Sequence, residues 1–459
     1  MPSGKEAPLI ALQAGSLIDG NGNHRTGGVS LLVEGDRIRS IGARDAEIPA
    51  GARVIDLGDR TLMPGLIDCH MHTNEFNGLT FENYRWARFE TSPQLQMLYG
   101  VFHAQICLEM GFTTLRDMGG MNYSGLNVNE IVAMREAFDG GILPGPRLVV
   151  AAWTTISGSH LDMVFPYSFP RAPEAMADGV DELRKLARSN IRKGADWIKT
   201  CLSGGAGVDR EELTVRNMTQ EEVDAVVEEA HAFRKACAAH CHTPESQKVA
   251  MNAGVDTLEH CVLTDDEAIE MMVERGIYLI PTLAHRTDRA IELRRRSGTP
   301  QFVLDKMQAI QETTYETFQR LREAGVKIAM GSDVQLDPEM GANAIELEVY
   351  VQLGMSPMEA ITTATRNAAE ALRLDDELGT LEAGKLADLI AVDGDPLDDI
   401  TTLQDRERIG MVMKGGQIFS SRIQGMERKL ISDHDWNERL DAALGGPQGE
   451  AIARERVNA

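Results

Sequence analysis

The chain has 459 residues, 43% of them hydrophobic, and a formal net charge of −24. This length predicts roughly two or three domains, or one large barrel with a small domain. The negative charge argues against nucleic acid and anionic membranes as partners, because their phosphates would be repelled. There is no run of about 18 apolar residues and no secretory signal pattern at the start. We therefore predict a soluble, cytoplasmic protein that binds neither nucleic acid nor membranes.

The six cysteines contain no CxxC pair, and a reducing compartment disfavours disulfides. Cys69, Cys241 and Cys261 each adjoin a histidine. Neighbouring side chains on a strand face opposite sides, so we expect these thiols to be buried packing residues.

Both ends of the chain have a β-rich pattern. Residues 8–60 contain short apolar runs separated by glycine-rich turns, and residues 379–393 and 409–419 return to this pattern. We predict that residues 1–64 and 376–425 meet in one small β-sandwich domain. Residues 426–459 are charged and weakly apolar, which indicates a helical extension. We also expect a homo-oligomer, in which this extension is available for assembly.

Residues 65–375 alternate strand-like apolar runs with long amphipathic stretches. Eight strands separated by helical crossovers indicate an α/β fold, a (β/α)8 TIM barrel. The predicted strands are residues 66–72, 113–117, 147–157, 196–203, 238–243, 257–263, 276–283 and 326–333.

The first of these strands ends in two histidines, His70 and His72, within the stretch LMPGLIDCHMHTN. Residues two apart on a strand project from the same side. Two imidazoles on one face at the end of a buried strand form half of a transition-metal site. On this stretch alone, two hydrogen-bonded structural histidines are the alternative.

Other strand ends carry similar groups, as expected for a barrel whose reacting residues gather at the carboxyl ends of its strands. His240 and His242 end the fifth strand, His260 the sixth and Asp333 the eighth. With the pair on the first strand, five of the eleven histidines lie at these ends. Imidazole and carboxylate ligands suit Zn²⁺, Mn²⁺ or Co²⁺.

Lys199, in the fourth strand, differs in kind because an ammonium group repels cations. A lysine buried beside metals loses its proton readily. Its neutral amine would react with CO₂ to give a carbamate, an anion with two oxygens. A lysine paired with a nearby carboxylate is the alternative.

The candidate ligands occur in the order typical of the amidohydrolase superfamily, which this chain resembles: His70, His72, Lys199, His240, His260 and Asp333. The stretch GTLEAGKLADLIAVDGDP (residues 379–396) is similar to that of its members. DWIKTCLSGG, AAHCHTPE and AGVDTLEHC resemble the imidazolonepropionase-related branch. That branch includes prolidase-like carboxypeptidases, ochratoxin-type amidases, and hydrolases of phenylurea and thiocarbamate herbicides.

The resemblance implies a centre with two divalent ions. Zn²⁺ is the first candidate, and Mn²⁺, Co²⁺ and Fe²⁺ are the alternatives. The histidines of the first strand and Asp333 would bind the more buried ion, and His240 and His260 the other. Carboxylated Lys199 and a hydroxide would bridge the two. Asp333 would also take the proton of the hydroxide and pass it to the leaving nitrogen.

Four further residues are candidate substrate contacts. His242 should face the same cavity as His240 and assist catalysis by contacting the substrate or oxyanion; a supporting role behind the ligands is the alternative. His160 lies in ISGSH, where relatives carry GGH, so the local loop differs. His285 follows the seventh strand and is predicted to line the substrate pocket; a position on a surface loop is the alternative. Arg116, near the end of the second strand, pairs with a substrate carboxylate or forms an internal salt bridge.

These observations predict a binuclear metal hydrolase that cleaves an amide-type C–N bond of a small molecule with a metal-bridging hydroxide. The substrate is a phenylurea or carbamate xenobiotic or an N-acyl amino acid, with an Xaa-Pro-like dipeptide as the alternative. Aromatic residues within 76–89 and 153–169 are suited to an apolar pocket wall. An inactive scaffold protein is the remote alternative, because such chains usually lose ligands and here all six positions are filled.

Overall fold

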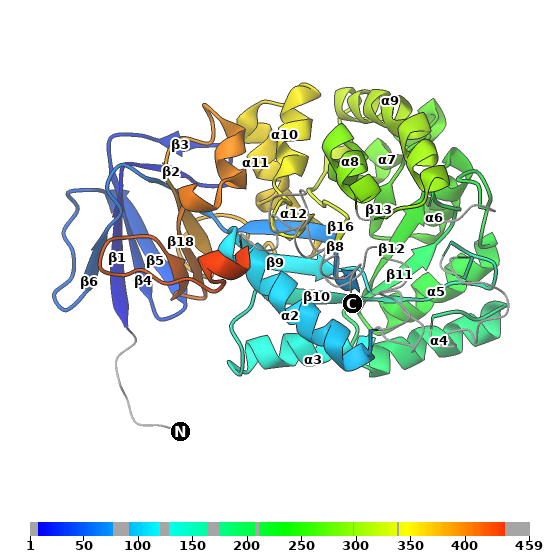
Figure 1. The fold of residues 1–459 in the computed structure, drawn as a ribbon, viewed down its shortest axis with the longest axis horizontal. Coiled ribbons are helices and arrows are strands. Elements are labelled where there is room, and N and C mark those ends of the chain that lie inside the picture. Colours follow the sequence, from blue (N-terminus) through cyan, green and yellow to red (C-terminus); the bar gives the residue numbers. More distant parts are fainter. Residues whose placement is uncertain are drawn as a thin grey trace, which may run out of the picture.

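The computed structural model describes residues 8–76, 91–119, 128–160, 162–163, 175–206, 211–296, 298–336 and 339–436. Figure 1 shows a β-rich part built from both chain ends, beside a barrel of strands surrounded by helices. Most of the predicted aromatic wall, residues 77–89, 161 and 164–169, lies outside the described residues.

The barrel is a closed sheet whose strand order, β15-β14-β13-β12-β11-β10-β9-β8-β16, follows the chain. Every neighbouring pair is parallel. The eighth strand is split in two, since β15 pairs with β14 and β16 pairs with β8. The predicted (β/α)8 barrel is therefore confirmed. Its strands are β8 (Leu66–Phe76), β9 (Phe112–Asp117), β10 (Arg147–Trp153), β11 (Trp197–Cys201), β12 (Ala236–Cys241), β13 (Thr257–His260), β14 (Tyr278–Ile280), β15 (Lys327–Ile328) and β16 (Val334–Leu336).

Helices on the outside cover the apolar faces of the strands, which are buried on both sides as in other parallel sheets. A capping box formed by Thr243 and Ser246 begins α6 two residues after β12 ends, and so fixes the path of His242. The helices are α2 (Pro93–Glu109), α3 (Val128–Asp139), α4 (Val180–Arg192), α5 (Gln220–Ala232), α6 (Pro244–Ala253), α7 (Asp266–Arg275), η1 (Ala284–Arg286), α8 (Asp288–Arg296), α9 (Gln301–Glu323), α10 (Ile345–Gln352), α11 (Pro357–Thr363) and α12 (Arg366–Ala371).

The second part contains two sheets, ordered β5-β4-β1-β6 and β19-β18-β17-β7-β2-β3. β7 and β17 pair antiparallel across more than 300 residues of sequence, with Thr61 opposite Val392. The predicted sandwich of both chain ends is confirmed, with a core that includes Leu12, Leu62 and Leu389. Its elements are β1 (Leu9–Ala14), β2 (Ser16–Ile18), β3 (His24–Arg25), β4 (Val29–Glu34), β5 (Arg37–Ala43), β6 (Arg53–Asp56), β7 (Thr61–Pro64), β17 (Leu389–Val392), η3 (Ile400–Gln404), η4 (Arg406–Arg408), β18 (Ile409–Lys414) and β19 (Gln417–Ser421).

The segment that follows the sandwich packs against the end of α2. Buried Glu109 accepts hydrogen bonds from Arg406 (2.8 Å) and from the backbone N–H groups of Leu430 and Ile431 (2.8 and 2.9 Å). Residues 427–432 are not helical, so the helix predicted from residue 426 starts at residue 433. Residues 437–459 of that predicted extension lie outside the described residues.

All six cysteines are buried free thiols, as expected from their spacing. Within the described residues, no helix is long and apolar enough to cross a membrane.

Candidate metal centre

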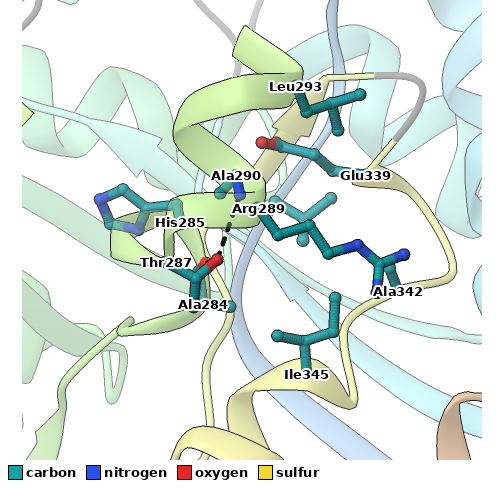
Figure 2. Close-up of a pocket in the computed structure, with 10 residues that line it drawn as sticks. Ala284, His285, Thr287, Arg289, Ala290, Leu293, Glu339, Ala342 and Ile345 are labelled. Carbon is teal, nitrogen blue, oxygen red and sulfur yellow. Dashed lines mark hydrogen bonds between the residues drawn. The ribbon is translucent and has the colours of Figure 1, made fainter. Parts of the chain in front are cut away.

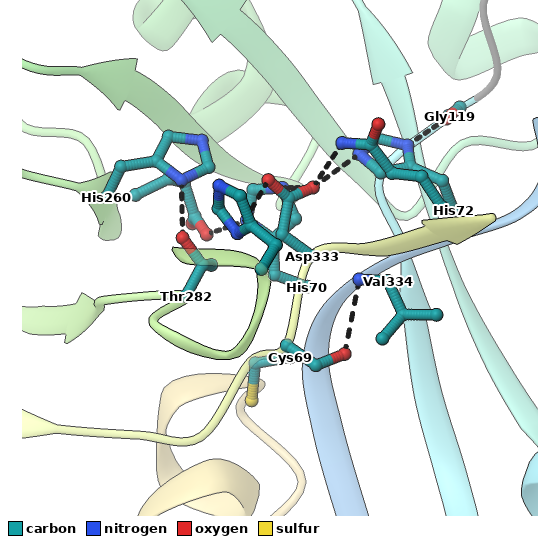
Figure 3. Close-up of polar contacts among 12 residues, drawn as sticks. Cys69, His70, His72, Gly119, His260, Thr282, Asp333 and Val334 are labelled. Carbon is teal, nitrogen blue, oxygen red and sulfur yellow. Dashed lines mark hydrogen bonds and ion pairs between the residues drawn. The ribbon is translucent and has the colours of Figure 1, made fainter. Parts of the chain in front are cut away.

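Three of the six predicted ligands, His240, His260 and Asp333, lie at or near the ends of barrel strands, while Lys199 lies in the middle of β11 and the two histidines of β8 lie within a strand that continues to Phe76. Figure 3 shows three of these side chains around the carboxylate of Asp333. The elements that carry them are β8 (His70 and His72), β11 (Lys199), β12 (His240), β13 (His260) and the turn before β16 (Asp333).

His70, His72 and Asp333 form a compact group of three buried ligands. Asp333 Oδ1 lies 3.6 Å from His70 Nε2 and 3.3 Å from His72 Nε2. One ligand atom from each residue lies within 4.8 Å of the others. Zinc binds nitrogen and oxygen ligands at about 2 Å, so three ligands of one ion lie at such separations. This group fits one divalent ion.

His240 and His260 lie beside this group, and Lys199 lies on β11, the strand that pairs with β12. The ring of His260 is 4.7 Å from that of His240 and 4.9 Å from that of His70, centroid to centroid. Lys199 is fully buried, and its Nζ has no hydrogen-bond partner. No ion pair within 4 Å joins Lys199 to a described carboxylate, so the paired-lysine alternative is not found. A buried amine without a hydrogen-bond partner, here 5.5 Å from the ring centroid of Trp153, fits a group that becomes an anionic ligand.

Burial keeps the imidazoles neutral. It lowers the pKa of His70 to about 4 and holds the pKa values of His240 and His260 well below 6.5. Burial also lowers the pKa of Lys199. Because metal ligands must carry a free lone pair, these shifts favour ion binding over protonation.

Hydrogen bonds behind the ligands orient the rings. His70 Nδ1 lies 2.6 Å from Glu259 Oε2, and His260 Nδ1 lies 2.7 Å from Thr282 Oγ1. Nδ1 of His72 contacts the carbonyl oxygen of Gly119 (Figure 3). A ring that donates from Nδ1 presents the lone pair of Nε2 on its other side, towards the centre.

Strained backbone marks the same strand ends. Six non-glycine residues in the described part have positive φ, and four lie here: His260 (73°), Cys261 (52°), Thr282 (55°) and Asp333 (54°). Such conformations cluster at functional sites because surrounding structure must hold them in place. At His260 the turn interrupts strand alternation, so Glu259 and His260 both face the barrel interior.

Three of the four predicted substrate contacts lie beside the ligands. The ring centroid of His242 is 5.1 Å from that of His260, and the ring of His160 stacks on His240 at 5.0 Å. His285 Nδ1 lies 3.6 Å from Asp333 Oδ2. Nδ1 of His242 and Nδ1 of His285 are buried without hydrogen-bond partners. Their roles toward a substrate stay predictions.

Arg116 lies elsewhere, which contradicts its predicted role as a substrate contact. Its side chain is fully buried and stacks on the ring of Trp197 at 4.5 Å. It donates hydrogen bonds to the backbone of Cys69, to Thr257 (3.1 Å) and to Glu259 (2.8 Å). Burial would raise the pKa of Glu259, but Arg116 and its other neighbours hold it at about 2. The internal salt bridge, the alternative reading, is found.

Replacing Arg116 with methionine is expected to lower the free energy of unfolding by about 3–5 kcal/mol, because Glu259 would remain as an unpaired buried charge. Denaturant unfolding measures this. Arg44→Met breaks an ion pair with exposed Asp56 and should cost less than about 1 kcal/mol. An equal loss in both variants would contradict the buried-pair account.

Two functional candidates were missed in the sequence. Glu259 precedes a ligand, and strand alternation would have turned it away from the centre. Arg286 follows His285 directly after the seventh strand and is 5% exposed. A basic residue next to a predicted pocket histidine was the available signal for Arg286.

A small pocket is lined by His285 on the side of the centre. Figure 2 shows it between α8 and the segment leading into α10, with Arg289 extending across it. Its wall is mainly apolar, formed by residues such as Ala290, Leu293, Val334 and Ile345.

Comparison with known proteins places this arrangement in a family. The model of the amidohydrolase family matches residues 61–419. Ochratoxinase from Aspergillus niger is 31% identical over 434 residues, covering 90% of this chain and 87% of that protein.

Solved structures agree. A Xaa-Pro dipeptidase with methionine bound in its active site has a TM-score of 0.81 and 32% identity, covering 90% of this chain and 99% of that one. Phenylurea hydrolase B, at 23% identity and a TM-score of 0.71, shares the fold over 89% of this chain and 96% of its own. The chain therefore belongs to the amidohydrolase family and is a hydrolase of amide-type carbon–nitrogen bonds.

Proposed function

We propose that this protein hydrolyses the amide bond of a small molecule with two divalent ions held by His70, His72, Lys199, His240, His260 and Asp333. The observation that carries the proposal is the compact buried group of His70, His72 and Asp333, to which Lys199 adds a buried Nζ without a hydrogen-bond partner. Zinc is the first candidate, since imidazole and carboxylate are its common ligands; Mn²⁺, Co²⁺ and Fe²⁺ are alternatives.

Lys199 would act as a carbamate. Burial favours the neutral amine, whose nitrogen attacks CO₂; one N–C bond forms and one proton is released. The product is an anion with two oxygens, able to bind both ions at once. This anion would attract the metal ions, whereas the ammonium form of lysine would repel them.

When bound, the ions would lower the pKa of water towards about 7 and polarise the scissile carbonyl. Asp333 lies close enough to both histidines of β8 to accept the proton of an attacking water. The same carboxylate would then give that proton to the leaving nitrogen, acting first as base and then as acid. His242, whose buried Nδ1 has no hydrogen-bond partner, would donate to the developing oxyanion.

Two substrate classes come from the relatives. Ochratoxinase and the Xaa-Pro dipeptidase, both above 30% identity, favour an N-acyl amino acid or a dipeptide. The phenylurea hydrolase, at 23% identity, supports the shared fold alone, so phenylureas and carbamates are the second candidate.

Metal analysis tests the proposal. Protein expressed with added zinc should contain about two ions per chain, and removal by a chelator should abolish turnover of amide substrates until Zn²⁺, Mn²⁺ or Co²⁺ is returned. His70→Ala should lose metal. His231 lies on α5 and forms an exposed ion pair with Asp256, so His231→Ala should retain the metal. Less than about one ion per chain in the replete protein would contradict the proposal.

A further inference from the structure

Arg286 is a buried cation beside the candidate centre. It is the last residue of η1 and is 5% exposed. Its backbone N–H donates to the carbonyl oxygen of Leu283 (2.9 Å), and its own carbonyl accepts from Gln311 (2.6 Å). Its guanidinium has no hydrogen bond or ion pair with any described residue.

This lack of a partner distinguishes Arg286 from the other buried arginines in the described part of the chain. Arg116 pairs with Glu259, Arg406 with Glu109 and Arg294 with Glu339. Burying a charge without an opposite charge is costly, so such groups are almost always paired. A guanidinium left unpaired at this position is suited to an anion that arrives with the substrate.

The surroundings show where that anion would lie. After burial, the charge of Arg286 is the strongest influence that lowers the pKa values of His242 and His285. The negative charge of Asp333 acts on Arg286 in return. Arg286 directly follows His285, whose Nδ1 lies 3.6 Å from Asp333 Oδ2, so Arg286 lies at the same end of the barrel as the predicted proton donor for the leaving nitrogen.

A mainly apolar pocket lies next to Arg286 in the chain, lined by residues on both sides of it, His285 and Thr287. His285, the neighbour of Arg286, lines the pocket shown in Figure 2 and also lies 3.6 Å from Asp333. Leu293, Val334 and Ile345 form part of its wall. The apolar part of this wall is suited to contact an apolar group of the substrate.

We propose that Arg286 binds a carboxylate on the leaving-amine side of the substrate. The substrate would be an amide whose leaving amine is an amino acid with an apolar side chain, such as an N-acyl amino acid or a dipeptide. Two parallel N–H···O bonds from the planar guanidinium would hold the carboxylate, which is one carbon from the scissile nitrogen. This inference rests on the proposed hydrolytic function and selects between its two substrate classes.

A pair of substrates that differ only in the carboxylate tests the inference. The metal-replete enzyme is assayed with N-acetyl-L-phenylalanine and with N-acetylphenethylamine, which has the same amide bond and no carboxylate. The expected ratio of kcat/KM values is at least about 10²-fold in favour of the acid, as for other buried charge pairs. A ratio near one would overturn the inference.

Variants show whether Arg286 is responsible. Arg286→Gln should abolish most of this ratio, and Arg286→Lys should leave an intermediate ratio because it keeps the charge without the planar fork. Arg295→Gln, in an exposed pair with Glu292 on α8, is the matched control and should retain the full ratio. Inhibition by free L-phenylalanine should weaken in parallel, and melting temperatures check that each variant is folded.

Several results would overturn the inference. The first is an unchanged kcat/KM ratio in both Arg286 variants. The second is loss of the ratio in Arg289→Gln but not in Arg286→Gln, because this result would assign carboxylate binding to Arg289 at the pocket. Turnover of phenylureas without turnover of N-acetyl-L-phenylalanine would also overturn it and leave the proposed hydrolase function in place. Failure of the hydrolase function is a separate outcome, in which the metal-replete protein cleaves none of these amides or ureas.

Discussion

Replacing Asp333 with asparagine is expected to lower kcat by about 10³-fold, within the range for loss of a general acid–base group. Asparagine has the same shape but cannot accept a proton at physiological pH. The remaining imidazoles should retain much of the metal, so the loss would appear in kcat more than in metal content. Steady-state kinetics with parallel metal analysis measures both quantities.

Asp305→Asn is the matched control for this prediction, since Asp305 accepts a hydrogen bond from Gln301 at the exposed start of α9. It should retain normal kcat and metal content. Near-normal turnover by Asp333→Asn would remove its role as proton carrier. Low turnover explained entirely by lost metal would make Asp333 a ligand alone.

Replacing Lys199 with alanine should remove the anionic bridge and with it much of the bound metal, lowering kcat/KM by at least about 10³-fold for a centre that acts as a unit. The cavity left by the side chain is buried among the ligands. A small carboxylate such as acetate or propionate, added at millimolar concentration, should therefore restore part of the activity.

Lys185→Ala, in an exposed pair with Glu182 on α4, should change neither metal content nor rate. A ¹³C carbamate signal from protein prepared with labelled bicarbonate should be present in the wild type and absent in Lys199→Ala. Two ions bound normally by Lys199→Ala would rule out the carbamate bridge.

Much of the fold and of the metal centre was predictable from local sequence patterns. The spacing of His70 and His72 placed two imidazoles on one face, because side chains alternate along a strand. The alternation of apolar runs with amphipathic helices predicted parallel βα units, and in such barrels strand ends meet at one rim. These rules are local or general, so a single sequence was sufficient.

The sequence was a poorer guide to which charges face the substrate. Arg116 lies in a predicted strand and Arg286 directly after one. The sequence left Arg116 between a substrate contact and an internal salt bridge, and it did not single out Arg286. In the structure Arg116 points into the barrel and pairs with Glu259, while Arg286 has no such partner. Pairing is made between residues more than 100 positions apart, which local patterns do not encode.

Residue type, order and short-range periodicity were enough to predict the class of fold, the candidate ligands and the amidohydrolase resemblance. Three features became visible only in the folded chain: Glu259 supports His70, positive φ at His260 turns both residues inward, and Arg286 is the one buried arginine of the described residues without an ion pair. The physical reason is that burial and charge pairing are properties of the assembled barrel, in which distant strands and loops supply or withhold each partner.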